Sequence, residues 1–99
     1  MHYKFKAKPW LYSGENPWVF VSVPKELSAE IKEVTSSVKR GFGSVRVAVK
    51  VNSIEWRTSI FPDSKTQTYL LPLKKDVRKS AHIQTDHTYE FEISIEGSV

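Results

Sequence analysis

The feature that most limits the fold of this chain is a pair of alternating segments separated by two residues. Every second residue from position 45 to 51 is valine, and Ile54, Trp56, Thr58 and Ile60 alternate with polar residues. A period of two is typical of a β-strand with one buried face. If the two residues between the segments form the turn, one face carries the pairs Val51 with Ile54, Val49 with Trp56, Val47 with Thr58, and Val45 with Ile60.

The charges and the turn agree with this register. Lys50 falls opposite Glu55 on the other face, where opposite charges attract across the strands. Asn52 suits the first central position of a type I′ turn, which needs a positive φ. Ser53 at the second position is less favourable than glycine. The sequence therefore predicts a two-residue β-hairpin at the centre of the chain.

Further strands are predicted on both sides of this hairpin. Tyr3, Phe5 and Ala7 alternate with lysines, and Pro9 then predicts an edge position or a bend. The apolar run from Trp18 to Val23 predicts a strand buried on both faces. The alternation from Tyr89 to Ile95 predicts a last, amphipathic strand.

Two segments that follow prolines have helical spacing instead. Pro24 suits the first position of a helix, which we expect to span about three turns and to end near Gly41 and Gly43. Pro72 precedes a shorter helix of about two turns. The apolar residues at helical spacing are Leu27, Ile31, Val34 and Val38 in the first helix, and Val77 and Ala81 in the second. Both units run from an apolar strand through a proline into a helix, half a chain apart, which suggests a pseudo-twofold barrel.

Composition limits the class of protein. Its 99 residues fit one domain, residues 1–99. The absence of cysteine excludes disulfides and thiolate zinc sites and fits a reducing cytosol. Neither a signal peptide nor an apolar run long enough to span a membrane is present, so we expect a cytoplasmic protein. We also expect it to be monomeric or weakly dimeric. The net charge of +4 favours encounter with polyanions but identifies no partner.

Several short motifs resemble a bacterial family, the domain of unknown function 1905, over about residues 3 to 96. The motifs are Trp18-Val19-Phe20, Gly43-Ser44-Val45, Trp56-Arg57-Thr58-Ser59, Phe61-Pro62, Leu71-Pro72 and Val77-Arg78. The resemblance implies a mainly β fold, a small double-split β-barrel of about six strands with two short helices and both pseudo-twofold halves in one chain. That architecture is shared with looped-hinge transition-state regulators, which bind DNA. The resemblance implies no established activity, substrate or catalytic residue.

The residue inventory offers no catalytic or cofactor-binding constellation. There is no nucleophile elbow, phosphate loop or zinc-protease motif, and "GFGS" at 41–44 precedes a strand and not a helix. His82, Asp86 and His87 are close in sequence, but their spacing does not impose a metal geometry. We therefore predict no catalytic residues, no cofactor and no metal site.

Tryptophans and basic residues supply the candidate sites. Three indoles, Trp10, Trp18 and Trp56, could line a cleft for a planar or apolar ligand. Of these, Trp18 and Trp56 form the candidate aromatic pocket, although core packing is the default role of Trp56. A candidate basic surface comprises Arg46, Arg57, Lys74, Lys75, Arg78 and Lys79. For Arg57 and Arg78 we favour a structural ion pair with a carboxylate such as Asp63 or Asp86.

Three functions stay open at this point. The first is a non-enzymatic binding or interaction module whose ligand or protein partner is unknown. The second is nucleic-acid binding through the basic helix face, and the third is small-molecule binding beside a tryptophan. The sequence favours the first over nucleic-acid binding and does not separate it from the third.

Overall fold

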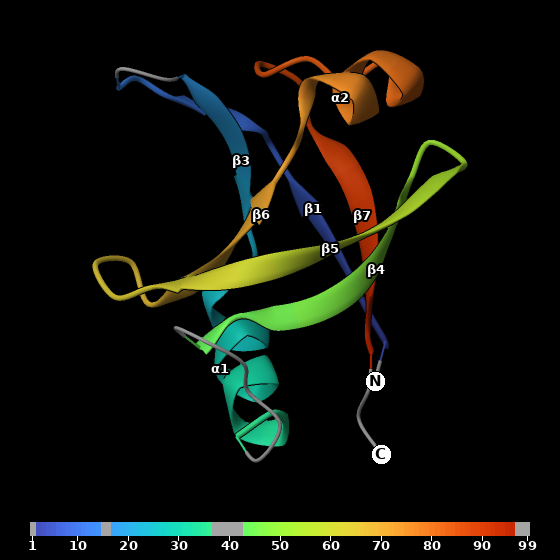
Figure 1. Ribbon diagram of the computed structural model, residues 1–99. Helices are drawn as coiled ribbons and strands as arrows, with labels where there is room; N and C mark the ends of the chain where they lie inside the picture. Colours follow the sequence, from blue (N-terminus) through green and yellow to red (C-terminus); the bar gives the residue numbers. More distant parts are fainter. Residues whose placement is uncertain (1, 15–16, 37–42, 97–99) are drawn as a thin grey trace.

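The computed structural model describes residues 2–14, 17–36 and 43–96. Within them the fold is mainly β, with seven antiparallel strands in a sheet that curls into a half-barrel, and two short helices (Figure 1). No helix in these ranges is long and apolar enough to cross a membrane. The elements are β1 (His2–Ala7), β2 (Trp10–Tyr12), β3 (Trp18–Ser22), α1 (Lys25–Val34), β4 (Val45–Val51), β5 (Ile54–Asp63), β6 (Thr68–Pro72), α2 (Lys75–Ala81) and β7 (Tyr89–Ile95).

The strand order, β1-β7-β4-β5-β6-β3-β2, begins and ends with strands that are consecutive in the chain. Only Lys8 and Pro9 separate β1, which pairs with β7, from β2, which pairs with β3. One bent stretch thus joins both ends of the sheet, as expected for a bend at Pro9. β5 likewise connects two parts of the sheet, because its residues 54–60 pair with β4 and its residues 61–63 pair with β6. Counting β1 and β2 as one strand gives the six strands that the resemblance implies.

Reciprocal hydrogen bonds define the pseudo-twofold relation of the halves. The Val23 N–H donates to the Tyr69 carbonyl at 2.9 Å, and the Leu73 N–H donates to the Val19 carbonyl at 2.9 Å. The same difference in residue number separates Val19 from Tyr69 and Val23 from Leu73, and it also separates the first residues of α1 and α2. The two prolines that suggested the repeat are not counterparts, because Pro24 directly precedes α1 whereas Pro72 lies inside β6.

The two helices are attached at equivalent places. The Ser28 hydroxyl on α1 donates to the Val23 carbonyl at 3.0 Å. The Arg78 guanidinium Nε on α2 donates to the Leu73 carbonyl, also at 3.0 Å. Ser28 and Arg78 are separated by the same difference in residue number as the two acceptors, Val23 and Leu73. Each helix is therefore held to the strand that precedes it by one side chain from its first turns.

The central hairpin confirms the predicted register at every pair. Val45 pairs with Ile60 and Val51 with Ile54, and Lys50 lies opposite Glu55. The turn residues have positive φ, 50° at Asn52 and 68° at Ser53, as a type I′ turn requires. The Asn52 side-chain amide also donates to the Ala81 carbonyl at 2.8 Å. This bond ties the hairpin tip to the end of α2.

Replacing Ser53 with glycine is expected to stabilise the fold by about 0.5–1 kcal/mol, since glycine adopts a positive φ without a steric cost. Ser53 is exposed and its side chain is not required by the core. Chemical denaturation of both proteins measures the difference. As a control, Ser36→Gly at another exposed position gives no gain, and an equal gain there would contradict the role assigned to φ.

Two predicted elements differ from the structure. On one face of β3, Val19 and Val21 are buried. On the opposite, outer face, Trp18 is exposed and Phe20 is half-buried. The prediction of a strand buried on both faces was therefore wrong. α1 ends at Val34, earlier than predicted. Its buried stripe continues through Thr35, whose hydroxyl donates to the Ile31 carbonyl at 2.6 Å, while Val34 faces solvent. The predicted end near Gly41 and the stripe residue Val38 lie outside the described residues.

Candidate functional site

The outer face of the sheet has two regions of different chemistry. Across β1, β7, β4 and β5, one row of paired residues alternates in charge: Lys4, Glu92, Lys50 and Glu55. Glu92 also contacts the His2 ring at 2.9 Å, and that hydrogen bond lowers the pKa of the carboxyl group. Neighbouring charges on this region therefore compensate each other, as on an ordinary solvated surface.

The second region, over β2, β3, β6 and the end of β5, is aromatic. Trp10 pairs with Phe20 and Tyr12 with Trp18 across β2 and β3, and alternation puts all four side chains on the outer face. The Trp18 and Phe20 rings stack with centroids 6.0 Å apart and an angle of 5° between their planes. Trp10 and Tyr12 lie 5.4 and 6.5 Å from the Phe20 ring. Phe20 is thus the centre of a four-ring cluster.

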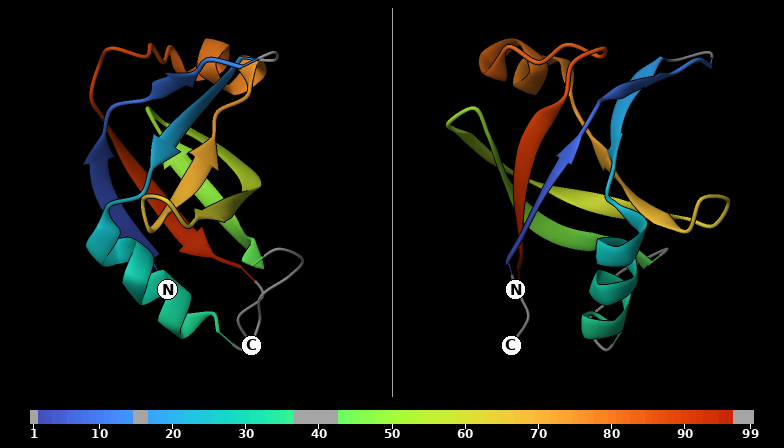
Figure 2. Two further views of the ribbon diagram at one scale, coloured as in Figure 1. Left: turned by 90° about the vertical axis from the view of Figure 1, so that its left-hand side faces the viewer. Right: turned by 180° about the vertical axis from the view of Figure 1, so that it is seen from behind.

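A groove of about 500 Å³ lies over this cluster. We call it the aromatic groove; Trp10, Tyr12, Trp18 and Phe20 line one side, and Phe61, Asp63, Lys65, Leu70 and Pro72 line the other. Figure 2 (left) looks onto this side of the barrel, where β3 and β6 run side by side above the β5–β6 loop. The groove therefore lies where the two pseudo-equivalent halves meet, with one wall from each half.

The groove is apolar, open and preorganised. Trp18 is 51% exposed, Tyr12 52% and Phe61 45%, so large apolar side chains face water at one place. The Trp10 indole N–H donates to the Ser22 hydroxyl at 3.0 Å, which fixes the orientation of that ring. One acid, Asp63, and one base, Lys65, balance the charge of the lining. These properties suit a ligand that is uncharged and has an apolar face.

The structure separates the two predicted tryptophans. Trp18 lies in the aromatic groove, whereas Trp56 is half-buried on the inner face and packs against the core. Trp10, one of the three indoles considered for such a cleft, also lines the aromatic groove, whereas Tyr12 and Phe20 were not predicted. The signal for this cluster was an aromatic residue at every second position in residues 10–12 and again in residues 18–20, which places four rings on one face when the two segments pair.

The six predicted basic residues lie on different elements of the fold. Lys74, Lys75 and Lys79 are exposed on or next to α2, whereas Arg46 and Arg57 project from the strands of the central hairpin. The Arg46 guanidinium contacts the Ser59 hydroxyl at 3.5 Å.

Arg57 and Arg78 have other partners than predicted. Arg57 lies 3.6 Å from the Glu96 carboxylate, and the exposure of its side chain makes this a weak ion pair. Arg78 is half-buried, and its guanidinium donates to the Leu73 carbonyl; within the ranges that the structure describes, it forms no ion pair with a carboxylate. Both expected acids are engaged elsewhere. The Asp63 carboxylate accepts from the Thr66 hydroxyl at 2.7 Å, and Asp86 contacts the His87 ring at 2.8 Å, which lowers the pKa of Asp86.

In the part of the chain that the structure describes, no three His, Cys, Asp or Glu side chains converge as a metal site requires, and this includes His82, Asp86 and His87. His82 instead ends α2 in a left-handed conformation, with φ at 56°.

Comparison with known proteins identifies one family. The sequence model of the family described as Domain of unknown function (DUF1905) matches residues 5–93. No curated protein matches the chain.

Proposed function

Because the chain belongs to the family described as Domain of unknown function (DUF1905), whose description assigns no activity, we propose its function from its geometry: it is a non-enzymatic binding module. The ligand occupies the aromatic groove. The observation that carries the proposal is the exposure of Trp18 within an ordered four-ring cluster.

Leaving such an apolar surface in water has a free-energy cost. Burying apolar area contributes about 25 cal/mol per Å², so covering the exposed parts of these rings favours association. A flat ligand gains a further ~0.5–1.5 kcal/mol for each favourable aromatic contact. The Trp10 bond to Ser22 and the stacking of Trp18 on Phe20 hold these rings before the ligand arrives, which reduces the entropy lost on binding.

The size and charge of the groove define the ligand class. Its volume of about 500 Å³ is within the range of small-molecule sites, and Asp63 and Lys65 leave no net charge in its lining. An uncharged compound with a flat apolar face, such as a heteroaromatic ring, fits both properties. A polyanion fits less well, because the exposed lysines of α2 are not part of the groove. Nucleic-acid binding through α2 is therefore the alternative.

Replacing Trp18 with alanine is expected to weaken ligand binding by about tenfold or more, since about 1.4 kcal/mol of lost ring contact has that effect. The folding midpoint changes little because Trp18 is half-exposed. Ligand-observed NMR with uncharged heteroaromatic fragments, sugars and labelled DNA measures binding, and thermal melting measures stability. In the matched control, Trp56→Phe removes an indole outside the groove and leaves binding unchanged.

Two outcomes contradict the proposal. In the first, no uncharged fragment binds saturably to the native protein. In the second, fragments bind but Trp18→Ala binds them as well as the native protein does. Binding of DNA alone, falling steeply between about 50 and about 200 mM salt, would instead support the nucleic-acid alternative.

A further inference from the structure

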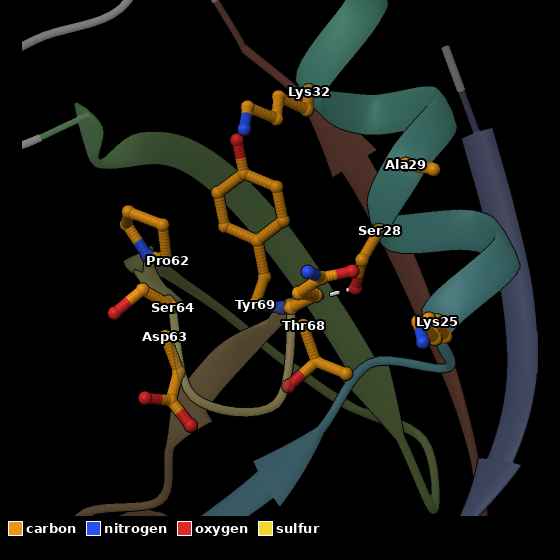
Figure 3. A pocket seen from close by; sticks show the side chains of 10 residues that line it. Lys25, Ser28, Ala29, Lys32, Pro62, Asp63, Ser64, Thr68 and Tyr69 are labelled. Atoms are coloured by element: carbon orange, nitrogen blue, oxygen red, sulfur yellow. Dashed lines mark hydrogen bonds between the residues drawn. The ribbon is translucent and has the colours of Figure 1, made fainter.

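A second cleft lies between α1 and the β5–β6 hairpin, on the other side of the β5–β6 loop from the aromatic groove. Its volume is about 560 Å³. Figure 3 shows α1 along one side, with Lys25, Ser28, Ala29 and Lys32, and the segment from Pro62 to Tyr69 along the other. We call it the helix cleft. It shares only Asp63 with the aromatic groove.

The floor of the helix cleft is a buried aromatic ring. Tyr69 is 3% exposed, and its ring extends from β6 so that its hydroxyl points toward the Lys32 side chain (Figure 3). The backbone N–H of Tyr69 donates to the Ser28 hydroxyl at 3.0 Å, which fixes the ring's strand against α1. Burial raises the pKa of the Tyr69 hydroxyl, and a side-chain hydrogen bond with Thr35 lowers it by less. Tyrosine has an ordinary pKa of about 10, so this hydroxyl is a neutral polar group near pH 7.

Two cations line the same cleft. Lys25 and Lys32 are two helical turns apart, so they project from one face of α1. Both are exposed, and neither forms an ion pair within the described ranges of the chain. Asp63 lies across the cleft, but its carboxylate accepts the Thr66 hydroxyl. The lining therefore carries a net positive charge over apolar walls of Ala29, Pro62 and the Tyr69 ring.

We propose that the helix cleft binds an amphipathic organic monoanion, such as a carboxylate with an aromatic or branched apolar body. The anionic group lies near Lys32 and the Tyr69 hydroxyl, where a cation and a neutral donor converge on the same space. The apolar body lies against Ala29 and Pro62. This site is separate from the aromatic groove, and either proposal can fail without the other.

The residues that line the helix cleft favour an amphipathic organic monoanion over three other classes of ligand. An inorganic anion would leave most of a volume of about 560 Å³ and its apolar walls unused. An uncharged ligand would leave the two ammonium groups without a partner, and charge-assisted bonds are stronger than neutral ones. A dianion or polyanion would meet Asp63 on the opposite wall.

Titration with anilinonaphthalene sulfonate, an aromatic monoanion that fluoresces in apolar sites, tests the proposal. We expect saturable binding to the native protein and competition by benzoate. The double variant Lys25→Gln with Lys32→Gln should bind about tenfold more weakly, a loss of about 1.4 kcal/mol, because the charge-assisted bonds to the anionic group are removed. The control Lys74→Gln with Lys75→Gln removes the same charge beside α2 and should retain native affinity.

Two further measurements separate charge recognition in the helix cleft from purely apolar binding and from binding in the aromatic groove. The uncharged analogue phenylnaphthylamine should bind the native protein and the double variant equally. Trp18→Ala should retain the part of sulfonate binding that depends on Lys25 and Lys32, since the aromatic groove is elsewhere. The proposal is overturned if the control variant loses as much affinity, if Trp18→Ala abolishes binding, or if binding is not saturable. Thermal melting verifies that each variant is folded, because partly unfolded chains also bind this dye.

Discussion

Replacing Phe91 with alanine is expected to lower the free energy of unfolding by about 3–5 kcal/mol. Phe91 on β7 is fully buried, stacks on Phe5 at 5.7 Å, and meets Tyr89 edge to face at 6.5 Å. The substitution leaves a cavity between β1 and β7, next to the bend that closes the sheet. Because a domain of this size is stabilised by only about 5–15 kcal/mol, the loss is a large fraction of the total.

Thermal and chemical denaturation measure this effect, and the melting temperature should fall by about 15 °C or more. Phe61→Ala is the matched control, because the Phe61 side chain lies on the outer face and is 45% exposed. Its cost should stay below about 1 kcal/mol. Equal losses for the two variants would show that the inner faces of β1 and β7 do not form the stabilising core.

The second large effect is expected at Ser28. Its hydroxyl donates to the Val23 carbonyl and accepts from the Tyr69 N–H, both at 3.0 Å, and the residue is 3% exposed. Ser28→Ala leaves a buried N–H without a partner, which costs about 1–3 kcal/mol. Because the lost bonds join α1 to β3 and β6, the helix should also separate from the sheet more often.

Two measurements distinguish the loss of this local bridge from a general loss of stability. Denaturation of Ser28→Ala gives the free-energy change, with Ser36→Ala, an exposed serine just after α1, as the control that should change it by less than about 0.5 kcal/mol. Hydrogen exchange of the Tyr69 amide should accelerate more than that of the Ile93 amide on β7, which does not contact Ser28 through a hydrogen bond. If both amides accelerate equally, the effect is global and Ser28 does not act as a local bridge.

The central hairpin could be predicted from sequence because its information is local. The period of two, the Lys50 and Glu55 pair, and the Asn52 turn all lie within one short segment, and all specify one register. The internal repeat came from comparing two segments half a chain apart, and the resemblance added the double-split form of the barrel. The number of strands was predicted correctly once β1 and β2 are taken as one bent strand around Pro9.

The elements that differed depend on distant contacts. β2 has only three residues and exists because Trp10–Tyr12 pair with β3. Whether Trp18 is buried depends on which outer faces the helices cover, and no local pattern specifies this. The charge pattern on α2 likewise did not show that Arg78 binds a carbonyl of its own chain, because that bond follows from the position of the β6–α2 junction.

The position of the aromatic groove at the junction of the halves has a consequence for selectivity. In a barrel assembled from two identical chains, each residue at such a junction occurs twice, and a substitution alters both walls together. Here one wall carries Trp18 and Tyr12, whereas the other carries Phe61 and Asp63. Because the two walls differ and each can change by itself, we expect a ligand with two unlike ends to bind the proposed site in one preferred orientation.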